Sequence, residues 1–491
     1  MTSPSTSTDA NTRWDARLWG LLIVLCSVLF LDGLDVSMVG VALPSIRDSL
    51  DLSASSLQWV VSGYVLGYGG LLLLGGRAAD LLGRRTVFLI ALGVFAGASL
   101  LGGLVSDPGL LIGARFIKGA SAAFTAPAGL SIITTTFAEG PVRNRALAFY
   151  TACGASGFSM GLVLSGLLTE VGWRWTFLLP APIAVAALLA AIRYVPRTAR
   201  PDRAGQRYDV TGAVTATASM LLFVYAVVEA PQAGWASAQT LLSFLVAAAL
   251  LATFVVVESR VEQPLVRLGI FRSPALIRAN LGAVILIGSY FGFQFLVTQY
   301  LQTLLGWSAL ETGLGFLPAG VMVALGATRL GPIVDRYGTA RLLAIGFGSL
   351  TLGYALFLRV GESSQYAAVV FPTIMLIGIG FALCYPSLNI QATAGVADHE
   401  QGLASGLINT SFQVGGALVL AVVTALMTSH GGNTAHTAHD LLASYRPGLI
   451  VSTGVAAVGF AIALYELASR RRGRDADAVL VRAGEPEFET V

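Results

Sequence analysis

The stretch Gly76-Arg-Ala-Ala-Asp80-Leu-Leu-Gly83-Arg84-Arg85 forms a short polar gap between two long apolar runs. A weaker copy, Gly331-Pro-Ile-Val-Asp335-Arg-Tyr-Gly338, follows in the second half of the chain, with Arg341 just beyond it. Glycine, aspartate and glycine recur with the same spacing in both copies. A polar motif repeated at matching places in two apolar halves is typical of a duplicated membrane bundle whose halves move against each other. The repeat therefore favours a transporter.

The composition excludes an ordinary soluble protein. Of the 491 residues, 55% are hydrophobic and 12% are charged. Soluble domains carry about 25% charged residues, so half of the charge expected of a soluble protein is missing. The three cysteines, Cys26, Cys153 and Cys384, lie inside apolar runs and show no spacing typical of disulfides or metal ligands. We conclude that the chain is an integral membrane protein.

Apolar stretches long enough for membrane helices recur along the whole chain, since a helix needs roughly 20 apolar residues to cross the hydrocarbon core. The fourteen stretches span residues 18–41, 57–76, 87–105, 109–133, 146–168, 175–195, 210–228, 241–257, 279–304, 313–328, 342–360, 367–390, 403–427 and 448–468. The sequence therefore predicts an all-α membrane protein with 14 transmembrane helices.

The basic residues predict the orientation of these helices, because Lys and Arg gather in cytoplasmic loops. With the N-terminus inside, most of the 30 basic residues fall on the cytoplasmic side. The exceptions on the outer side are Arg47, Arg174, Arg359 and Arg446. We therefore predict that both termini are cytoplasmic, which also places both copies of the polar motif on the cytoplasmic face.

The predicted helices divide into six, two and six when the ninth begins the second half. Residues 1–17 form a cytoplasmic tail without a signal-peptide cleavage pattern, and residues 18–195 form the first six-helix bundle. Residues 196–278 form a linker with the inserted seventh and eighth helices. Residues 279–468 form the second six-helix bundle, and residues 469–491 form a cytoplasmic tail. We expect a multi-pass protein of the cytoplasmic (inner) membrane.

Several short motifs resemble those of the 14-helix drug:proton antiporters of the major facilitator superfamily. Their order and spacing carry the resemblance from the first predicted helix to the thirteenth. The motifs are Leu34-Asp35-Val36-Ser37 with Ala42-Leu43-Pro44, Trp59-Val60-Val61 with Tyr64, the stretch 76–85, Arg115 with Gly119, Trp173-Arg174-Trp175, Tyr300-Leu301-Gln302 and Leu317-Pro318. The resemblance implies proton-coupled export of drugs, antibiotics or related organic metabolites by alternating access of two bundles.

The resemblance also implies that the repeated polar motif closes a cytoplasmic gate. An aspartate at a helix end is suited to pair with a helix N-terminus or with an arginine across the bundle interface. A simpler interpretation is a tight turn flanked by cytoplasmic arginines. The gate residues would be Gly76, Asp80, Gly83, Arg84 and Arg85 in the first copy and Gly331, Asp335 and Gly338 in the second.

The fifth predicted helix departs from the antiporter pattern. Small residues remain at three positions of this helix, namely Gly157, Gly161 and Gly166. Small residues let helices pack closely, so we expect a close helix contact here. Leu162 stands in place of the usual proline, and Ser165 stands in place of one glycine. Losing the proline removes a kink. This departure keeps a second hypothesis open, a proton symporter or uniporter for a small organic solute.

Four charged residues lie within predicted membrane helices, where charge is costly and marks functional sites. Asp32 and Asp35 share one face of the first helix, and Arg115 and Lys118 share one face of the fourth, because each pair is spaced by three residues. At 1.5 Å per residue, Asp35 and Arg115 lie about 26 and 27 Å from the cytoplasmic helix ends. Asp32 and Lys118 lie about 21 and 22 Å from those ends.

The matched depths predict two acid–base pairs, Asp35 with Arg115 and Asp32 with Lys118. Our hypothesis is that Asp35, together with Asp32, takes up and releases the coupling proton, because a carboxyl whose cationic partner approaches or leaves can switch its protonation. The alternative is a fixed ion pair that only positions the two helices.

Polar side chains on the ninth and thirteenth predicted helices are candidates for a substrate cavity. Tyr290, Gln294 and Thr298 follow one another at intervals of four residues, as do Asn409 and Gln413. Polar groups on one face of a membrane helix either line a cavity or bond to a neighbouring helix. Phe291 and Phe295 lie beside the first stripe and favour a large, partly apolar organic substrate.

The sequence predicts no enzyme, cofactor or metal site. A phosphate-binding loop needs a lysine after its glycines, and the only lysine, Lys118, lies within a predicted membrane helix. The predicted helices contain no cluster of nucleophile, base or metal ligands. We expect a monomer whose partners are a small organic substrate, protons and the lipid bilayer, and no nucleic acid.

Overall fold

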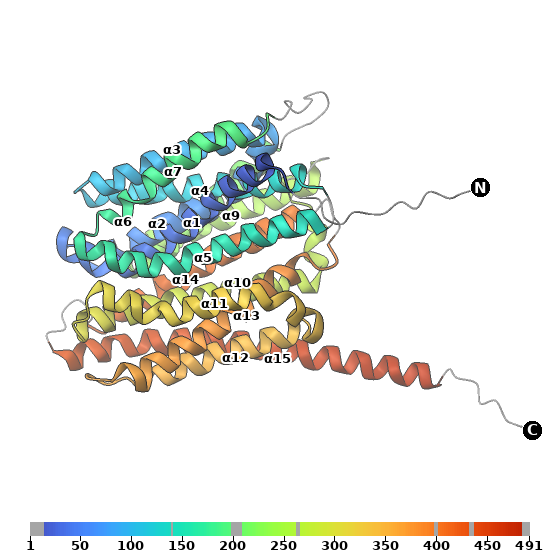
Figure 1. The fold of residues 1–491 in the computed structure, drawn as a ribbon. Helices are drawn as coiled ribbons and strands as arrows, with labels where there is room; N and C mark the ends of the chain where they lie inside the picture. The colour runs from blue at the N-terminus through green and yellow to red at the C-terminus, as the bar shows by residue number, and fades with distance from the viewer. Residues whose placement is uncertain are drawn as a thin grey trace, which may run out of the picture.

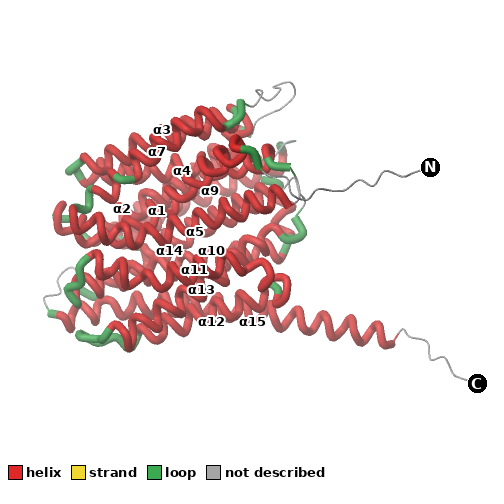
Figure 2. Tube along the Cα trace, in the orientation of Figure 1, coloured by secondary structure: helices red, strands yellow, loops and turns green. Residues whose placement is uncertain are grey.

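The computed structural model describes residues 14–138, 141–197, 209–261, 266–396, 401–431 and 437–483. Within these residues every regular element is a helix and none is a strand. The long helices run side by side along one common direction (Figures 1 and 2). Both ends of the described chain lie at the same end of the molecule. We call this the terminal end of the molecule. The other end, at which α1 finishes, is called the opposite end.

Within the described residues, the first part of the chain supplies seven α-helices, and the second supplies six after a pair in the middle. The first seven are α1 Ala16–Leu50, α2 Ala54–Leu82, α3 Arg84–Leu104, α4 Pro108–Thr136, α5 Pro141–Val171, α6 Trp175–Leu178 and α7 Pro180–Tyr194. The middle pair is α8 Val210–Ala233 and α9 Ala238–Arg260. The remaining six are α10 Pro274–Gln299, α11 Ala309–Tyr337, α12 Thr339–Phe357, α13 Phe371–Thr393, α14 Gln401–Ser429 and α15 Ala438–Ala483.

Thirteen helical segments among the described residues are long and apolar enough to cross a membrane. The short α6 and the adjoining α7 together make one of them, Trp175–Tyr194. The second predicted span, residues 57–76, lies within α2, which is a helix of 29 residues. The prediction of an all-helical membrane protein is therefore confirmed.

Several helices extend beyond the apolar stretches that predict them. α1 continues to Leu50, so Arg47 lies in its last turn and not in a loop. α15 continues to Ala483 and includes most of the segment expected to be a tail. Hydropathy detects only the apolar part of a helix, whereas caps determine where its hydrogen bonds begin and end. At the start of α1, for example, the Asp15 carboxylate accepts from the Leu18 backbone N–H at 2.7 Å.

The helices pack mainly within two groups, α1–α7 and α10–α15, which we call the N-terminal and C-terminal groups. Figure 1 draws these groups one above the other, in blue to green and in yellow to red. Glycines permit the closest contacts. A Cβ at Gly157 of α5 would lie 2.2 Å from the Phe30 carbonyl oxygen of α1, and one at Gly119 of α4 would lie 2.0 Å from the Tyr64 carbonyl oxygen of α2.

The serine that departs from the antiporter pattern contributes to the same contact. Ser165 is fully buried and donates a hydrogen bond to the Met38 carbonyl oxygen of α1. One turn before it, a Cβ at Gly161 would lie 2.7 Å from the Leu34 carbonyl oxygen. The structure thus places Gly157, Gly161 and Ser165 of α5 directly on the backbone of α1.

The two groups meet along α5 with α11 and along α2 with α14. At the first seam, a Cβ at Gly166 of α5 would lie 2.7 Å from the Leu310 Cα of α11. Near it, Gln302 donates to the Val41 carbonyl oxygen of α1 at 3.0 Å. These contacts lie at the opposite end, where α1 finishes and α11 begins.

The buried apolar residues divide unevenly between the two ends. One core cluster contains the interior of the C-terminal group together with opposite-end residues of the N-terminal group such as Val41, Leu57 and Leu162. A second cluster fills the terminal-end half of the N-terminal group and contains only residues of that group, such as Leu25 and Ile133. The largest described cluster thus joins the two groups at the opposite end, and a small cluster of Val65, Val224, Val228 and Ala417 joins α2 to α14 through α8.

Candidate functional site

A cluster of buried charges joins α1 to α4. Asp35 and Lys118 are 0% exposed and Arg115 is 1% exposed. Arg115 Nη1 contacts one oxygen of the Asp35 carboxylate, and Lys118 Nζ contacts the other. One carboxylate therefore holds two cations in a setting from which water is excluded, where such pairs are strong and where losing one partner is costly.

Further contacts fix both cations in place. Arg115 Nε donates to the Val60 carbonyl oxygen of α2 at 2.9 Å, and its guanidinium lies 4.7 Å from the centre of the Tyr64 ring. Lys118 Nζ lies 4.9 Å from the centre of the Phe95 ring. Rings at these distances attract cations through their negative faces. Helices α1, α2, α3 and α4 all contribute to this one cluster.

Asp32 does not pair with Lys118, so this part of the predicted pairing is wrong. Asp32 is 5% exposed, and its Oδ2 atom has no hydrogen-bond partner. Depths counted along two separate helices are uncertain by about one turn, and a lysine side chain is long enough to reach across such a turn. Lys118 reaches Asp35 instead, which leaves Asp32 as the buried acid without an ion pair.

The two copies of the polar motif adopt the same conformation at their last glycine. Gly83 ends α2 with a φ of 91°, and Gly338 ends α11 with a φ of 74°. Both angles lie in the left-handed region, which glycine adopts without strain. The surroundings of Asp80, Gly331 and Asp335 lie outside the described part of the structure.

Other residues of the first copy pack within the N-terminal group. Arg85 donates to the carbonyl oxygens of Ile192 and Val195, each at 2.8 Å. It thereby binds the C-terminal end of α7, where unpaired carbonyls favour a cation. Gly76 makes only an ordinary contact, since a Cβ there would lie 3.8 Å from the Pro127 Cβ.

Two of the predicted cavity residues lie where the two groups face each other. The Tyr290 ring lies 5.9 Å from Phe158 of α5 and 5.3 Å from Phe381 of α13. Gln294 lies opposite Gly40 of α1, where a Cβ would be 3.2 Å from Gln294 Nε2. That nitrogen has no hydrogen-bond partner. Gln294 lines a small pocket together with Val36, Gly40, Leu43, Val61, Phe291, Phe295 and Leu420.

The other three predicted cavity residues have different surroundings. Thr298 is buried, and its hydroxyl has no partner. Asn409 donates to the Ser405 carbonyl oxygen of its own helix at 2.8 Å. Gln413 packs against α2, where a Cβ at Gly69 would lie 2.9 Å from the Gln413 Cβ. Gln413 therefore contributes to the contact between α2 and α14.

A row of stacked aromatic rings continues from Tyr290 and was not predicted. Phe381 is parallel to Phe158 with ring centres 6.2 Å apart, and it stacks on Tyr385 at 5.5 Å. Tyr385 in turn stacks on Phe412 of α14 at 4.9 Å. The row spans α5, α13 and α14, so only the folded chain brings its members together.

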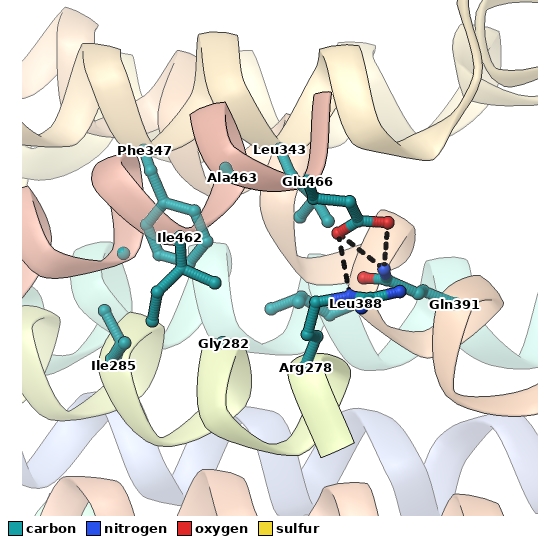
Figure 3. A pocket seen from close by; sticks show the side chains of 11 residues that line it. Arg278, Gly282, Ile285, Leu343, Phe347, Leu388, Gln391, Ile462, Ala463 and Glu466 are labelled. Atoms are coloured by element: carbon teal, nitrogen blue, oxygen red, sulfur yellow. Dashed lines mark hydrogen bonds and ion pairs between the residues drawn. The ribbon is translucent and has the colours of Figure 1, made fainter. Parts of the chain in front are cut away.

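Glu466, a buried acid outside the charge cluster of α1 and α4, was also missed. Its carboxylate accepts from Gln391 Nε2 at 2.8 and 2.9 Å and lies 3.5 Å from Arg278 Nε (Figure 3). These residues come from α15, α13 and α10 and lie beside a small pocket within the C-terminal group. Its signal in the sequence is a single acidic residue inside the apolar stretch 448–468.

Comparison with known proteins identifies the family. The sequence pattern of the Major Facilitator Superfamily matches residues 25–420. The chain belongs to the major facilitator superfamily. It is 37% identical over 446 residues to a cephamycin export protein of Amycolatopsis lactamdurans, with 90% of each chain covered. It is 35% identical over 475 residues to a puromycin resistance protein of Streptomyces alboniger, covering 94% of this chain and 93% of the relative.

Two solved transporter structures share the fold. The human organic anion transporter MFSD10 superimposes with a TM-score of 0.64 at 16% identity, covering 92% of this chain and all of that one. A peptide transporter of the POT family superimposes with a TM-score of 0.63 at 17% identity, covering 92% and 97%. The chain is therefore a superfamily transporter with relatives in antibiotic resistance and export, and the prediction that it is not an enzyme is confirmed.

Proposed function

We propose that this transporter exports antibiotics or related organic metabolites across the cytoplasmic membrane by proton-coupled alternating access. The observation that carries the proposal is the buried charge cluster, in which Asp35 holds two cations while Asp32 holds none. A buried acid without an ion pair, beside a fixed pair, is suited to exchange a proton with a water-filled cavity. The cephamycin and puromycin relatives support an antibiotic or a similar compound as the substrate.

Asp32 and Asp35 have different roles in this proposal. To bind a proton, Asp35 would have to release Arg115 and Lys118. Asp32 has a free carboxylate oxygen and breaks no ion pair when it is protonated. We therefore assign proton exchange to Asp32. Asp35, Arg115 and Lys118 form the charged cluster that experiences a changed electric field when Asp32 gains or loses its proton.

The distribution of the apolar core supports alternating access. With cytoplasmic termini, the opposite end, where one apolar core joins both groups, faces outward. The terminal end, where the N-terminal group has a core of its own, faces the cytoplasm. The conformation is then closed to the outside, and the N-terminal and C-terminal groups are the two six-helix bundles that rock about a central site.

The central site takes its substrate-facing groups from both bundles. Tyr290 and Gln294 come from α10, and Phe158 of α5 lies beside Tyr290. The aromatic row to Phe412 offers ring faces to a large organic molecule, and the unpaired amide of Gln294 offers a hydrogen bond. This combination of apolar walls and few polar groups is typical of sites for organic ligands.

Transport assays test the proposal directly. The gene is expressed in a drug-sensitive host. The growth of these cells is then measured with a panel of antibiotics that includes puromycin and a cephamycin, in the presence and absence of a proton uncoupler. We expect resistance that the uncoupler abolishes. Purified protein in liposomes should then move the same compound against its concentration gradient when protons flow down their own gradient in the opposite direction. Accumulation of a solute along with protons would instead support the symporter hypothesis that Leu162 keeps open.

A further inference from the structure

The inserted helices α8 and α9 contribute no residue to the buried charge cluster or to the pocket beside Gln294. α8 lies at the seam where α2 of the N-terminal group meets α14 of the C-terminal group, and it contacts both helices. Among the described residues α9 packs chiefly on α8. If the two groups rock against each other, α8 cannot stay fixed to both α2 and α14.

The contacts of α8 with α2 are polar as well as apolar. Trp59 Nε1 of α2 donates to Glu229 Oε2 of α8 at 3.2 Å, and the Trp59 ring lies 5.9 Å from the Tyr225 ring. About two turns along α8, Leu221 fills the space left by Gly70 of α2, where a Cβ would lie 2.4 Å from the Leu221 Cδ2. These contacts combine a directional bond with close packing.

The contact of α8 with α14 is apolar. Ala417 of α14 shares a buried cluster with Val224 and Val228 of α8 and with Val65 of α2. No hydrogen bond or ion pair joins α8 to α14 among the described residues. The described α8–α14 contact contains no directional bond that must break when one helix shifts along the other, whereas a shift of α8 along α2 would break the Trp59–Glu229 hydrogen bond. The α8–α14 contact is therefore the one suited to move.

We propose that Glu229 is a positioning residue that holds the inserted pair on α2, so that α8 and α9 move with the N-terminal group while α14 slides over α8. The inference rests on the alternating access of the proposed function. α8 would then cover the α2–α14 seam from the lipid throughout the cycle. α9 follows α8, since Ser219 donates to the Ala247 carbonyl oxygen at 2.8 Å.

Reducible cross-links between engineered cysteines test which contact moves. The background carries serine at Cys26, Cys153 and Cys384, and it must transport like the parent. One variant carries Gly70→Cys with Leu221→Cys, which joins α8 to α2. The matched variant carries Val228→Cys with Ala417→Cys, which joins α8 to α14. After oxidation with copper phenanthroline, which takes up the two electrons released when the disulfide forms, the first variant should keep its transport rate, and the second should lose it and regain it on reduction.

Other results would overturn the inference. Loss of transport in the first variant would mean that α8 moves relative to α2, and retained transport in the second would mean that α14 does not slide over α8. Cross-linking yields, measured by gel shift at several pH values and with puromycin, give a readout without transport. The α8–α2 yield should stay constant, and the α8–α14 yield should vary. A parent protein that moves no compound would count against the proposed function and not against this inference.

Substitutions at Glu229 separate its hydrogen bond from its charge. Glu229→Gln keeps an oxygen that accepts from the Trp59 indole, so this variant should retain the parent kcat. Glu229→Leu and Trp59→Phe both remove the bond and should lower kcat with little change in KM. They should also make the α8–α2 cross-linking yield vary with pH. Loss of transport in Glu229→Gln would show that the charge is needed, and this would overturn the positioning role.

Discussion

Lys118 of α4 contacts the carboxylate of Asp35 on α1, and because Arg115 contacts the same carboxylate, Asp32 remains buried without a cation. The two acids lie one helical turn apart on one helix, yet their surroundings differ. Asp35 is held by an arginine and a lysine, whereas one oxygen of Asp32 has no partner at all. This asymmetry separates a group that maintains the helix contact from a group that is available for proton exchange.

Asp32→Asn should abolish coupling while leaving the fold intact. The substitution removes the exchangeable proton and breaks no ion pair, so the protein should reach the membrane in normal amount. We expect pH-gradient-driven export in liposomes to fall by about ten-fold or more, which corresponds to about 1.4 kcal/mol or more. Asp48→Asn, on an exposed position of the same helix, is the matched control. Export at the parent rate by Asp32→Asn would contradict the role of Asp32.

A double-mutant cycle should find that Lys118 is coupled to Asp35 more strongly than to Asp32. Asp35→Asn leaves two buried cations without their acid and should destabilise the protein by about 3–5 kcal/mol. Combined with Lys118→Met, it should show an interaction free energy of about 0.5–3 kcal/mol, the range for residues in contact. Unfolding in detergent measures these values. A larger coupling in the Asp32→Asn and Lys118→Met cycle would restore the pairing predicted from helix depth.

Gly157→Ala should lower the thermal stability of the protein. Its Cβ would lie 2.2 Å from the Phe30 carbonyl oxygen, and overpacking of this kind costs about 1–3 kcal/mol. Gly97→Ala is the matched control, because no atom lies within 4 Å of its Cβ. That variant should be neutral or gain up to about 1 kcal/mol from helix propensity. Equal melting temperatures of the two variants would show that α5 does not need its small residues at α1.

Gln294→Leu should weaken substrate binding, whereas Asn409→Leu should not. Gln294 has an unpaired amide nitrogen beside the pocket between the groups, and Asn409 is bonded to its own helix. Losing one hydrogen bond of about 0.5–1.5 kcal/mol raises KM by about 2- to 10-fold. Initial rates of export over a range of substrate concentrations measure this change. A larger effect at Asn409 would place the substrate nearer to α14.

Asp80→Asn should reduce transport several-fold without reducing the amount of protein in the membrane. The expectation follows from the position of Asp80 near the end of α2, before the left-handed turn at Gly83. An ionised acid there can pair with an arginine or a helix N-terminus of the other bundle, and an amide pairs more weakly. Asp51→Asn, at the left-handed residue after α1, is the control. Unchanged export would contradict the gate hypothesis and would mean that the motif only forms a tight turn.

The fold class, the resemblance to the family and the four charged residues of α1 and α4 could all be predicted from the sequence. These features depend on local properties, namely runs of apolar residues, the spacing of the repeated motif and single charges inside those runs. Gly83 and Gly338 illustrate this, because the same local spacing produces a left-handed glycine at the end of each helix. The predicted positions of the helix ends were less accurate. Arg47, for example, lies within α1 although the apolar stretch that predicts this helix ends before it.

Which of these residues contact one another depends on how the helices pack in three dimensions. The partner of Lys118 depends on how far α4 is shifted along α1, and a shift of one turn exchanges Asp32 for Asp35. Trp59 and Glu229 meet because α8 lies on α2, and Phe158 meets Phe381 because α5 faces α13. Such contacts join residues far apart in the chain. Their geometry follows from the packing of whole helices. Local patterns of residues do not predict this packing.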